Sequence, residues 1–257
     1  MKKIIDIDTP VRIIGDIHGG FEEFEATVRE ARDAGRFVIS LGDPEDRGPE
    51  PAKCVKLIMD LYDEGHGDEV MSNHKWKHIR AYEGRPVKLK LEHINTQNDI
   101  NSMGEDFAQR YLNFGRRVPW FIEYGNNFFA HAAYHGMAED VETLSKHDRS
   151  TLQQRLIYGM TTGRIADSGY PVRLLDWFDK IPDHMNVFVG HHILSTSNIL
   201  NFRTTGGNAY FVDLGFQSHD GGQLAWVDFD KGEITGSSVD IIQVGDPREY
   251  GDYRVEE

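Results

Sequence analysis

Short apolar runs that end in Gly-Asp, each followed by a segment of helical length, dominate the first part of the sequence. The run 11–15 leads to Asp16, and the run 37–41 leads to Asp43. Between them, 21–34 carries apolar residues at helical spacing. Strands that alternate with helices predict a parallel or mixed α/β sheet, whose polar residues meet at the carboxyl ends of the strands.

The rest of the chain predicts a second sheet and a helical insertion. We expect strands over 69–71, 120–124, 127–130 and 186–189, and helices over 51–62, 104–114, 151–158 and 172–177. In the last quarter, the short runs 209–212, 223–228 and 233–244 are expected to form a second, antiparallel sheet. The segment 76–117 is rich in charged and amide residues and is expected to form a cap over the site. We therefore expect one domain over 1–257, with two sheets face to face, helices outside and this insertion.

Composition excludes several classes of protein. The single cysteine, Cys54, excludes a disulfide-rich secreted domain and favours a reducing, cytoplasmic setting. No apolar run is long enough to cross a membrane, so no membrane association is expected. The formal net charge of −14 repels long polyanions, so we expect no extended nucleic-acid-binding surface. A small anionic substrate is compatible with this charge where metal ions or arginines reverse the local potential.

Five junctions after predicted strands carry residues that bind metal ions. They contain Asp16 and His18; Asp43, Asp46 and Arg47; Asn73 and His74; His131; and the pair His191 and His192. Each alone is typical of a turn or a helix cap. Together they form a set of oxygen and imidazole ligands without thiolates, which suits manganese, iron, zinc or nickel, and two ions could share one carboxylate. Six other histidines lie in polar contexts and are predicted to be solvated: His66, His78, His93, His147, His184 and His219.

The order of these motifs resembles that of the calcineurin-like metallophosphoesterases, in the branch of the phosphoprotein phosphatases. The motifs extend from 15 to 215. Softer similarities, over 74–77, 84–87, 156–163, 169–173 and 213–215, resemble the phosphatase domain of bacterial polynucleotide kinase-phosphatase. The resemblance implies a four-layer α/β/β/α sandwich with a helical cap insertion.

The resemblance also implies a role for each site residue. Asp16 and His18 would hold one divalent ion, Asp43 would bridge, and Asn73, His131 and His191 would hold a second ion, with His192 as the fallback. In this scheme the two ions, most simply Mn²⁺ with Ni²⁺, Fe²⁺ or Zn²⁺ as alternatives, generate a hydroxide that attacks the phosphoryl group. His74 would protonate the leaving group, oriented by Asp46, while Arg47 would bind the phosphate and Asp213 would support the metal site.

The third motif departs from the family pattern Gly-Asn-His-Glu. Ser72 stands where the family has glycine, and Lys75 stands where the family has an acid. Both Asn73 and His74 are kept, so we expect an active enzyme.

The predicted function is hydrolysis of phosphate monoesters, with nucleotide or RNA-end phosphates as the favoured substrates. This class includes 2′- and 3′-phosphates and 2′,3′-cyclic phosphates. The alternatives are a diadenosine tetraphosphate hydrolase and a protein Ser/Thr phosphatase. A further alternative, of a different class, is a phosphate-binding module with little turnover, for which the substitutions at Ser72 and Lys75 are the only support.

Overall fold

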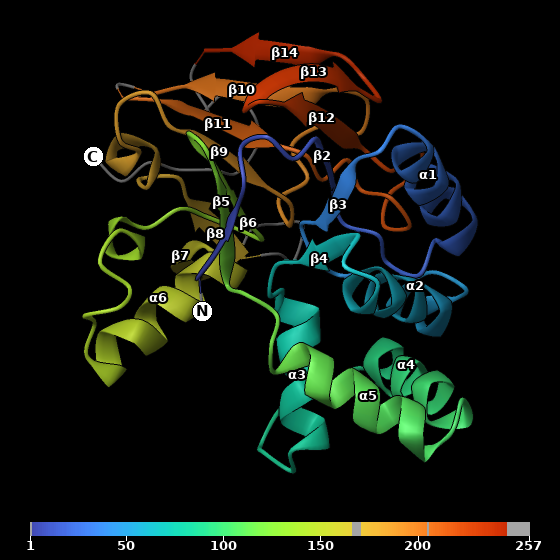
Figure 1. Ribbon diagram of the computed structural model, residues 1–257. Coiled ribbons are helices and arrows are strands. Elements are labelled where there is room, and N and C mark those ends of the chain that lie inside the picture. The colour runs from blue at the N-terminus through green and yellow to red at the C-terminus, as the bar shows by residue number, and fades with distance from the viewer. Residues whose placement is uncertain (1, 166–170, 205, 246–257) are drawn as a thin grey trace.

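A computed structural model describes residues 2–165, 171–204 and 206–245, and its larger sheet has seven strands (Figure 1). Their order across the sheet is β1-β5-β6-β9-β11-β10-β14. The strands are β1 (Lys2–Ile5), β5 (Phe121–Tyr124), β6 (Asn127–Ala130), β9 (Asn186–Val189), β11 (Asn208–Phe211), β10 (Ile199–Arg203) and β14 (Ile241–Val244). The pairs β6–β9 and β9–β11 are parallel, whereas β5–β6 and β10–β11 are antiparallel.

The second sheet has five strands in the order β13-β12-β2-β3-β4. They are β13 (Glu233–Ser237), β12 (Trp226–Asp230), β2 (Val11–Ile14), β3 (Phe37–Ser40) and β4 (Gly67–Glu69). The strands β2, β3 and β4 are parallel to one another, and β12 pairs antiparallel with β2. In a separate two-stranded sheet, β7 (Met160–Ile165) pairs antiparallel with β8 (Pro171–Leu174).

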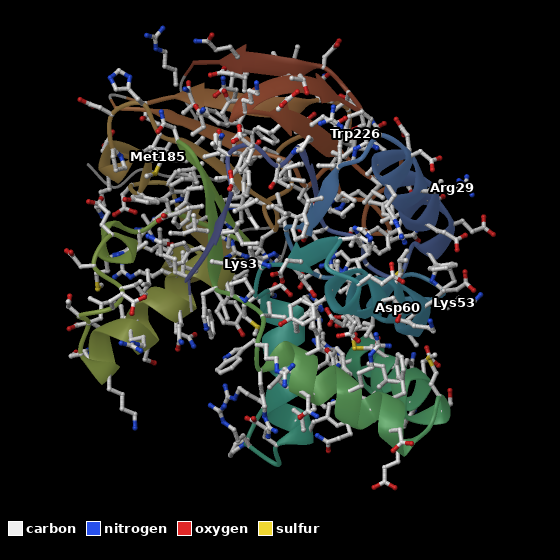
Figure 2. The ribbon with its side chains drawn as sticks, in the orientation of Figure 1. Lys3, Arg29, Lys53, Asp60, Met185 and Trp226 are labelled. Atoms are coloured by element: carbon white, nitrogen blue, oxygen red, sulfur yellow. The ribbon has the colours of Figure 1, made fainter. Side chains whose placement is uncertain are left out.

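Helices cover the outer faces of both sheets, which gives four layers. They are α1 (Phe21–Asp33), α2 (Pro51–Asp63), α3 (Asn73–Tyr82), α4 (Leu91–Ser102), α5 (Glu105–Gly115) and α6 (Lys146–Tyr158), with short 3₁₀ turns η1 (Gly136–Ala138) and η2 (Phe178–Lys180). Figure 1 shows α1 and α2 beside the smaller sheet and α6 near the larger one, while α3, α4 and α5 extend below α2. The labelled side chains of Arg29 and Lys53 point away from the sheets (Figure 2). In the part of the chain that the structure describes, no helix has the length and apolar character needed to cross a bilayer.

The space between the two sheets is filled by a buried apolar cluster. On β2, Val11 and Ile13 join this cluster, whereas Ile14 faces the helices, as the alternation of a strand requires. The facing sheet contributes Phe129 of β6 and Phe188 of β9. Burial of this apolar surface fixes the two sheets face to face, so that the ends of their strands form one edge.

Most elements expected from the sequence are present with small shifts of their ends. The expected four-layer sandwich, with two sheets face to face and helices outside, is confirmed. The expected strand 69–71 lies two residues earlier, as Gly67–Glu69. The segment 76–117 is largely helical, although α3 already begins at Asn73. The sequence did not predict α4, because its few apolar residues do not form a clear apolar face.

Two expectations about the second half of the chain are wrong. The segment 172–177 is not a helix, because its first residues form β8 and pair with β7. The strands of the last quarter do not form a sheet of their own. Those at 226–230 and 233–237 extend the sheet of β2, whereas those at 208–211 and 241–244 belong to the larger sheet. The sheet that each of these strands joins depends on pairing with strands that are far away in the sequence.

A buried ion pair joins β2 to its antiparallel neighbour β12. The guanidinium of Arg12 donates from Nε to Oδ1 of Asp228, over 2.7 Å, and from Nη2 to Oδ2, over 2.8 Å. The ring of Trp226 lies 3.6 Å from the guanidinium carbon, and Arg36 also contacts Asp228. This two-pronged contact fixes β2, the strand that leads to Asp16, against β12.

We predict that Asp228→Ala lowers the free energy of unfolding by about 3–5 kcal/mol, because it leaves the buried Arg12 with only its longer contact to the exposed carboxylate of Glu30. Urea unfolding followed by far-UV circular dichroism measures the change. The control is Glu233→Ala on the exposed side of β13, which should stay within about 0.5 kcal/mol of the parent chain. Equal stability of the two variants would contradict the assignment.

Candidate metal centre

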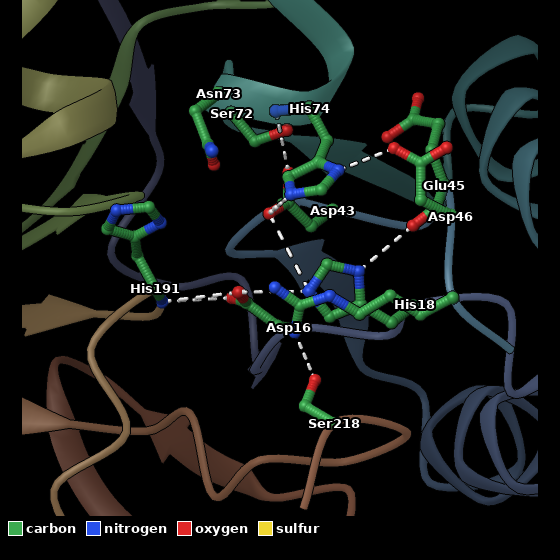
Figure 3. A network of polar contacts seen from close by, with 12 residues as sticks. Asp16, His18, Asp43, Glu45, Asp46, Ser72, Asn73, His74, His191 and Ser218 are labelled. Carbon is green, nitrogen blue, oxygen red and sulfur yellow. Dashed lines mark hydrogen bonds and ion pairs between the residues drawn. The ribbon is translucent and has the colours of Figure 1, made fainter. Parts of the chain in front are cut away.

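The residues expected to bind metal converge on the edge where the strands of both sheets end (Figure 3). In the smaller sheet, Asp16 follows β2, Asp43 follows β3, and Asn73 opens α3 shortly after β4. In the larger sheet, His131 follows β6, and His191 follows β9 after one glycine. Five separate turns therefore place their side chains in one site, as the carboxyl ends of neighbouring strands allow.

Several of these turns hold a non-glycine residue in the left-handed backbone region. At the site, the positive φ angles are 44° at His18, 50° at Asp43, 66° at Asp46, 65° at Arg47 and 63° at His191. Such conformations are costly for residues with a Cβ, and they persist only where the surrounding structure imposes them. A concentration of such residues at one place is typical of functional sites.

Asp43 lies at the centre of the site. Its Oδ2 is 3.4 Å from Nε2 of His131, 3.8 Å from Nε2 of His18 and 4.0 Å from Nε2 of His74. Asp43 is also the residue shared by two groups of side chains that could each hold an ion: one with His18 and His74, and one with His131 and His191. This central position is the one that a bridging carboxylate requires.

Asp16 lies on the other side of the same histidines. Its Oδ2 is 3.8 Å from Nε2 of His18, its Oδ1 is 3.8 Å from Nδ1 of His131, and it accepts the backbone N–H of His191 over 3.2 Å. Gly190 allows this approach, because a Cβ at that position would lie 2.2 Å from Oδ1 of Asp16.

The hydrogen bonds of the histidines leave lone pairs that face the carboxylates. Nδ1 of His18 contacts the carbonyl oxygen of Glu45 over 3.0 Å, and Nδ1 of His131 contacts that of Leu41 over 2.9 Å. A carbonyl only accepts, so in neutral imidazoles both Nδ1 atoms donate, and both Nε2 atoms keep their lone pairs.

These lone pairs need a cation. Nε2 of His131 faces the amide oxygen of Asn73 over 2.7 Å and also faces the carboxylate of Asp43. All three groups are hydrogen-bond acceptors, so none of them can donate to another. Nε2 of His191 is buried and has no hydrogen-bond partner among the residues that the structure describes. Histidines that ligate metal characteristically donate their other N–H to a carbonyl in this way. The donor set therefore fits divalent metal ions.

The pKa shifts of the site residues also favour the binding of cations. Burial raises the pKa of Asp16, and the nearby carboxylates of Asp213 and Asp43 raise it further. Burial also raises the pKa of Asp43, but His74 and His131 outweigh this effect, and its net pKa is lowered. The pKa of His18 is lowered to about 3, chiefly by burial and then by Arg47. His18 is thus neutral beside crowded carboxylates, and bound cations would relieve the repulsion between those carboxylates.

His74 and Asp46 form a buried pair at one side of the centre. Nδ1 of His74 donates to Oδ2 of Asp46 over 2.5 Å. Burial alone would lower the pKa of His74, but Asp43 and Asp46 raise it more, so that the net shift is upward. This contact leaves Nε2 of His74 facing Asp43 at 4.0 Å, toward the centre.

The prediction that His78 and His93 are solvated is wrong, because both side chains are buried beside this pair. Nε2 of His78 donates to Oδ1 of Asp46 over 3.0 Å. The ring of His93, from α4, stacks on that of His74 with 5.1 Å between centroids and 2° between planes. The spacing of four residues between His74 and His78 was a usable signal for His78. His93 comes from a helix that was not predicted.

The substitutions at the third motif are compensated by their neighbours. Ser72 caps α3 by accepting the backbone N–H of Lys75, and Gly42 opposite leaves the space that its side chain needs. Lys75 is fully buried, and its ammonium pairs with Glu45 and, over 3.3 Å, with Glu69. The positive charge is thus placed between two acids, away from Asn73 and His74, whose positions are kept.

The remaining predicted residues lie close to this centre. Arg47 is exposed, its Nη1 donates to Ser218, and its charge reaches both Asp16 and Asp213. Asp213 is buried, and its Oδ1 accepts the N–H of Gly215 over 2.9 Å. His192 stacks on Phe211 instead. Within 2–165, 171–204 and 206–245, no group suited to an ion contains His192. Gly169 and Tyr170, part of one softer similarity, lie outside the described residues.

Comparison with known proteins identifies the family. The model of the calcineurin-like phosphoesterases matches residues 9–235, so the chain belongs to this family of metal-dependent phosphoric ester hydrolases. Family members hold two divalent ions in one centre.

Individual relatives lie within the same family. The chain is 26% identical over 195 residues to the asymmetrical bis(5′-nucleosyl)-tetraphosphatase PrpE of Bacillus subtilis, which covers 70% of this chain and 77% of the relative. It is 26% identical over 207 residues to the enzyme of the same name from Oceanobacillus iheyensis, over 74% of this chain and 80% of the relative.

Solved structures share the fold. One, reported as a candidate diadenosine tetraphosphatase, has a TM-score of 0.59 at 20% identity and covers 92% of this chain and 96% of its own. A Saccharomyces cerevisiae protein serine/threonine phosphatase has a TM-score of 0.58 at 14% identity, over 92% of this chain and 82% of its own.

We predict that Asp43→Asn removes most of the binding of manganese, because it takes the negative charge from the carboxylate that both ligand groups share. Isothermal titration calorimetry of metal-stripped protein measures the stoichiometry and affinity. Asp6→Asn, at an exposed position after β1, is the matched control and should bind like the parent chain. Unchanged binding by Asp43→Asn would contradict the central position of this residue.

Proposed function

We propose that this chain hydrolyses dinucleoside tetraphosphates with the help of two divalent metal ions. The observation that carries the proposal is the shared name of the two bacterial relatives, each matched over most of its length. The buried carboxylates, the histidines and the exposed Arg47 support a site for a small, highly charged phosphate compound. This changes the order of the substrates expected from the sequence, in which the dinucleotide was the alternative.

RNA-end phosphates are the second candidate substrates. They are supported by the segments 74–77, 84–87 and 156–163, which resemble the repair phosphatase. The same site chemistry would serve a 2′- or 3′-phosphate, so the substrates must be compared directly.

We propose that Asp16 and His18 hold one ion, that Asp43 is shared, and that Asn73, His131 and His191 hold the second. Manganese is the proposed ion, and nickel, iron and zinc suit the same ligands. When bound, such ions supply positive charge to the phosphoryl oxygens and lower the pKa of nearby water.

The chain's own residues would bind the phosphate and supply the proton. Arg47 is exposed beside the centre and is oriented by Ser218, so that its guanidinium can bind two phosphate oxygens. Hydrolysis forms a bond from phosphorus to the oxygen of water and breaks the bond to the leaving oxygen. Where the leaving group is an alkoxide, its oxygen would receive the proton held at Nε2 of His74, while Asp46 keeps the ring oriented through Nδ1.

Phosphate and nucleotide release by metal-stripped protein that is refilled with manganese or nickel tests this function. The substrates are diadenosine tetraphosphate, an oligoribonucleotide with a 3′-phosphate, a 2′,3′-cyclic nucleotide, an aryl phosphate and a phosphopeptide. We expect metal-dependent cleavage with the highest kcat/KM for diadenosine tetraphosphate. A preference for the RNA end or the peptide would overturn the substrate assignment. The absence of turnover on every substrate would support a phosphate-binding module instead.

We predict that His74→Ala reduces kcat by roughly 10²–10⁴-fold for the oligoribonucleotide with a 3′-phosphate, whose alkoxide leaving group needs a proton. An aryl phosphate should lose much less, because its leaving group is stable as an anion. Steady-state kinetics at saturating manganese measure both losses. Equal losses for the two substrates would remove His74 from the role of general acid.

A further inference from the structure

Lys77 is a half-buried cation next to the pair formed by His74 and Asp46. It lies on α3, three residues after His74, and its Nζ is 3.3 Å from Nε2 of His93. Among the described residues, no carboxylate lies within 4.0 Å of this ammonium group. The function proposed above gives Lys77 no role.

The surroundings of Lys77 differ from those of the other lysines in the described ranges. Lys75, two residues earlier, is buried between two carboxylates. Lys88, Lys146 and Lys231 also lack a carboxylate within 4.0 Å, but their side chains are exposed to water. A half-buried ammonium whose nearest polar neighbour is the ring of His93, and not an anion, has lost hydration without gaining a counter-charge, which is unfavourable.

An anionic group of the substrate would supply the counter-charge that the ammonium of Lys77 lacks. Burial lowers the pKa of Lys77, and the more distant Asp43 and Asp46 only partly oppose this effect. Acidic residues outnumber basic ones in this chain, so a lysine beside the centre with no carboxylate of the described residues within 4.0 Å is informative. A phosphate oxygen near Nζ would supply the missing negative charge.

The position of Lys77 places this anion on the side of the leaving group. Residues three apart on a helix share a face, so Lys77 projects from the same face of α3 as His74. The ring of His93 lies beside both side chains: it stacks on the ring of His74, and its Nε2 is 3.3 Å from Nζ of Lys77. The ring of His93 is itself fixed, since its Nδ1 accepts the backbone N–H of Lys90 over 3.2 Å.

A third metal ion is a weaker explanation for this cluster. Asp46, His74 and His93 are close enough together to hold one. However, the rings of His74 and His93 are parallel, so their lone pairs do not converge on a common point. The ammonium of Lys77 beside Nε2 of His93 would also repel a cation.

We propose that Lys77 binds a phosphate of the leaving group and so selects substrates with a chain of phosphates over simple monoesters. This inference rests on the proposed function, in which His74 faces the leaving oxygen. Asymmetric cleavage of a dinucleoside tetraphosphate always gives a leaving group that begins with a phosphate. Lys77 would neutralise the charge that develops there, whereas His74 would serve leaving groups that need a proton.

The experiment compares Lys77→Met with the parent chain on diadenosine tetraphosphate and on an aryl phosphate. Loss of a charged contact to phosphate is expected to lower kcat/KM for the tetraphosphate by roughly 10- to 100-fold more than for the aryl phosphate. Lys77→Arg should recover part of the selectivity, because it restores the charge. The matched control is Lys88→Met, which removes an exposed lysine without a carboxylate partner and should leave the selectivity unchanged.

A second measurement separates this inference from the proposed substrate. Calorimetry at a fixed concentration of free manganese gives the affinities of each variant for ADP and AMP. In the parent chain we expect ADP to bind more tightly than AMP, and in Lys77→Met we expect this difference to shrink at least tenfold. Cleavage of RNA ends in preference to the tetraphosphate would overturn the proposed substrate alone. Equal losses for both assay substrates, or an unchanged preference for ADP, would overturn the role of Lys77.

Discussion

Three carboxylates buried within one site are the constraint on which the rest of this structure depends. Asp16, Asp43 and Asp213 are each at most 3% exposed, and their charges repel one another. His18 and His131 contact backbone carbonyls through Nδ1 and turn their Nε2 atoms toward the carboxylates, so these two rings offer lone pairs and not positive charge. Such a cluster is stable when cations fill it, which ties the fold of this edge to metal binding.

The backbone holds this unfavourable cluster together through strained turns. Left-handed conformations at His18, Asp43 and His191 direct side chains from separate strands to one place. The apolar layer between the sheets and the pair of Arg12 with Asp228 fix the strands on which these turns rest. The interior thus supplies the free energy that the site requires.

The sequence predicted the ligands better than it predicted their surroundings. Asp16, Asp43 and His131 were identifiable because each ends an apolar run, and strand ends of one sheet meet at one edge. His93 and Lys77 were not identifiable, because their importance comes from α4 lying against α3, a tertiary contact that polar helical sequences do not reveal. For the same reason, the sheet to which each late strand belongs could not be predicted from local pattern.

Anomalous X-ray diffraction from crystals soaked in manganese tests the central claim most directly. The account predicts two anomalous peaks, one on each side of the carboxylate of Asp43, with His18 near one peak and both His131 and His191 near the other. A single peak that does not contact Asp43, or a peak between Asp46 and His93 in its place, would contradict the account.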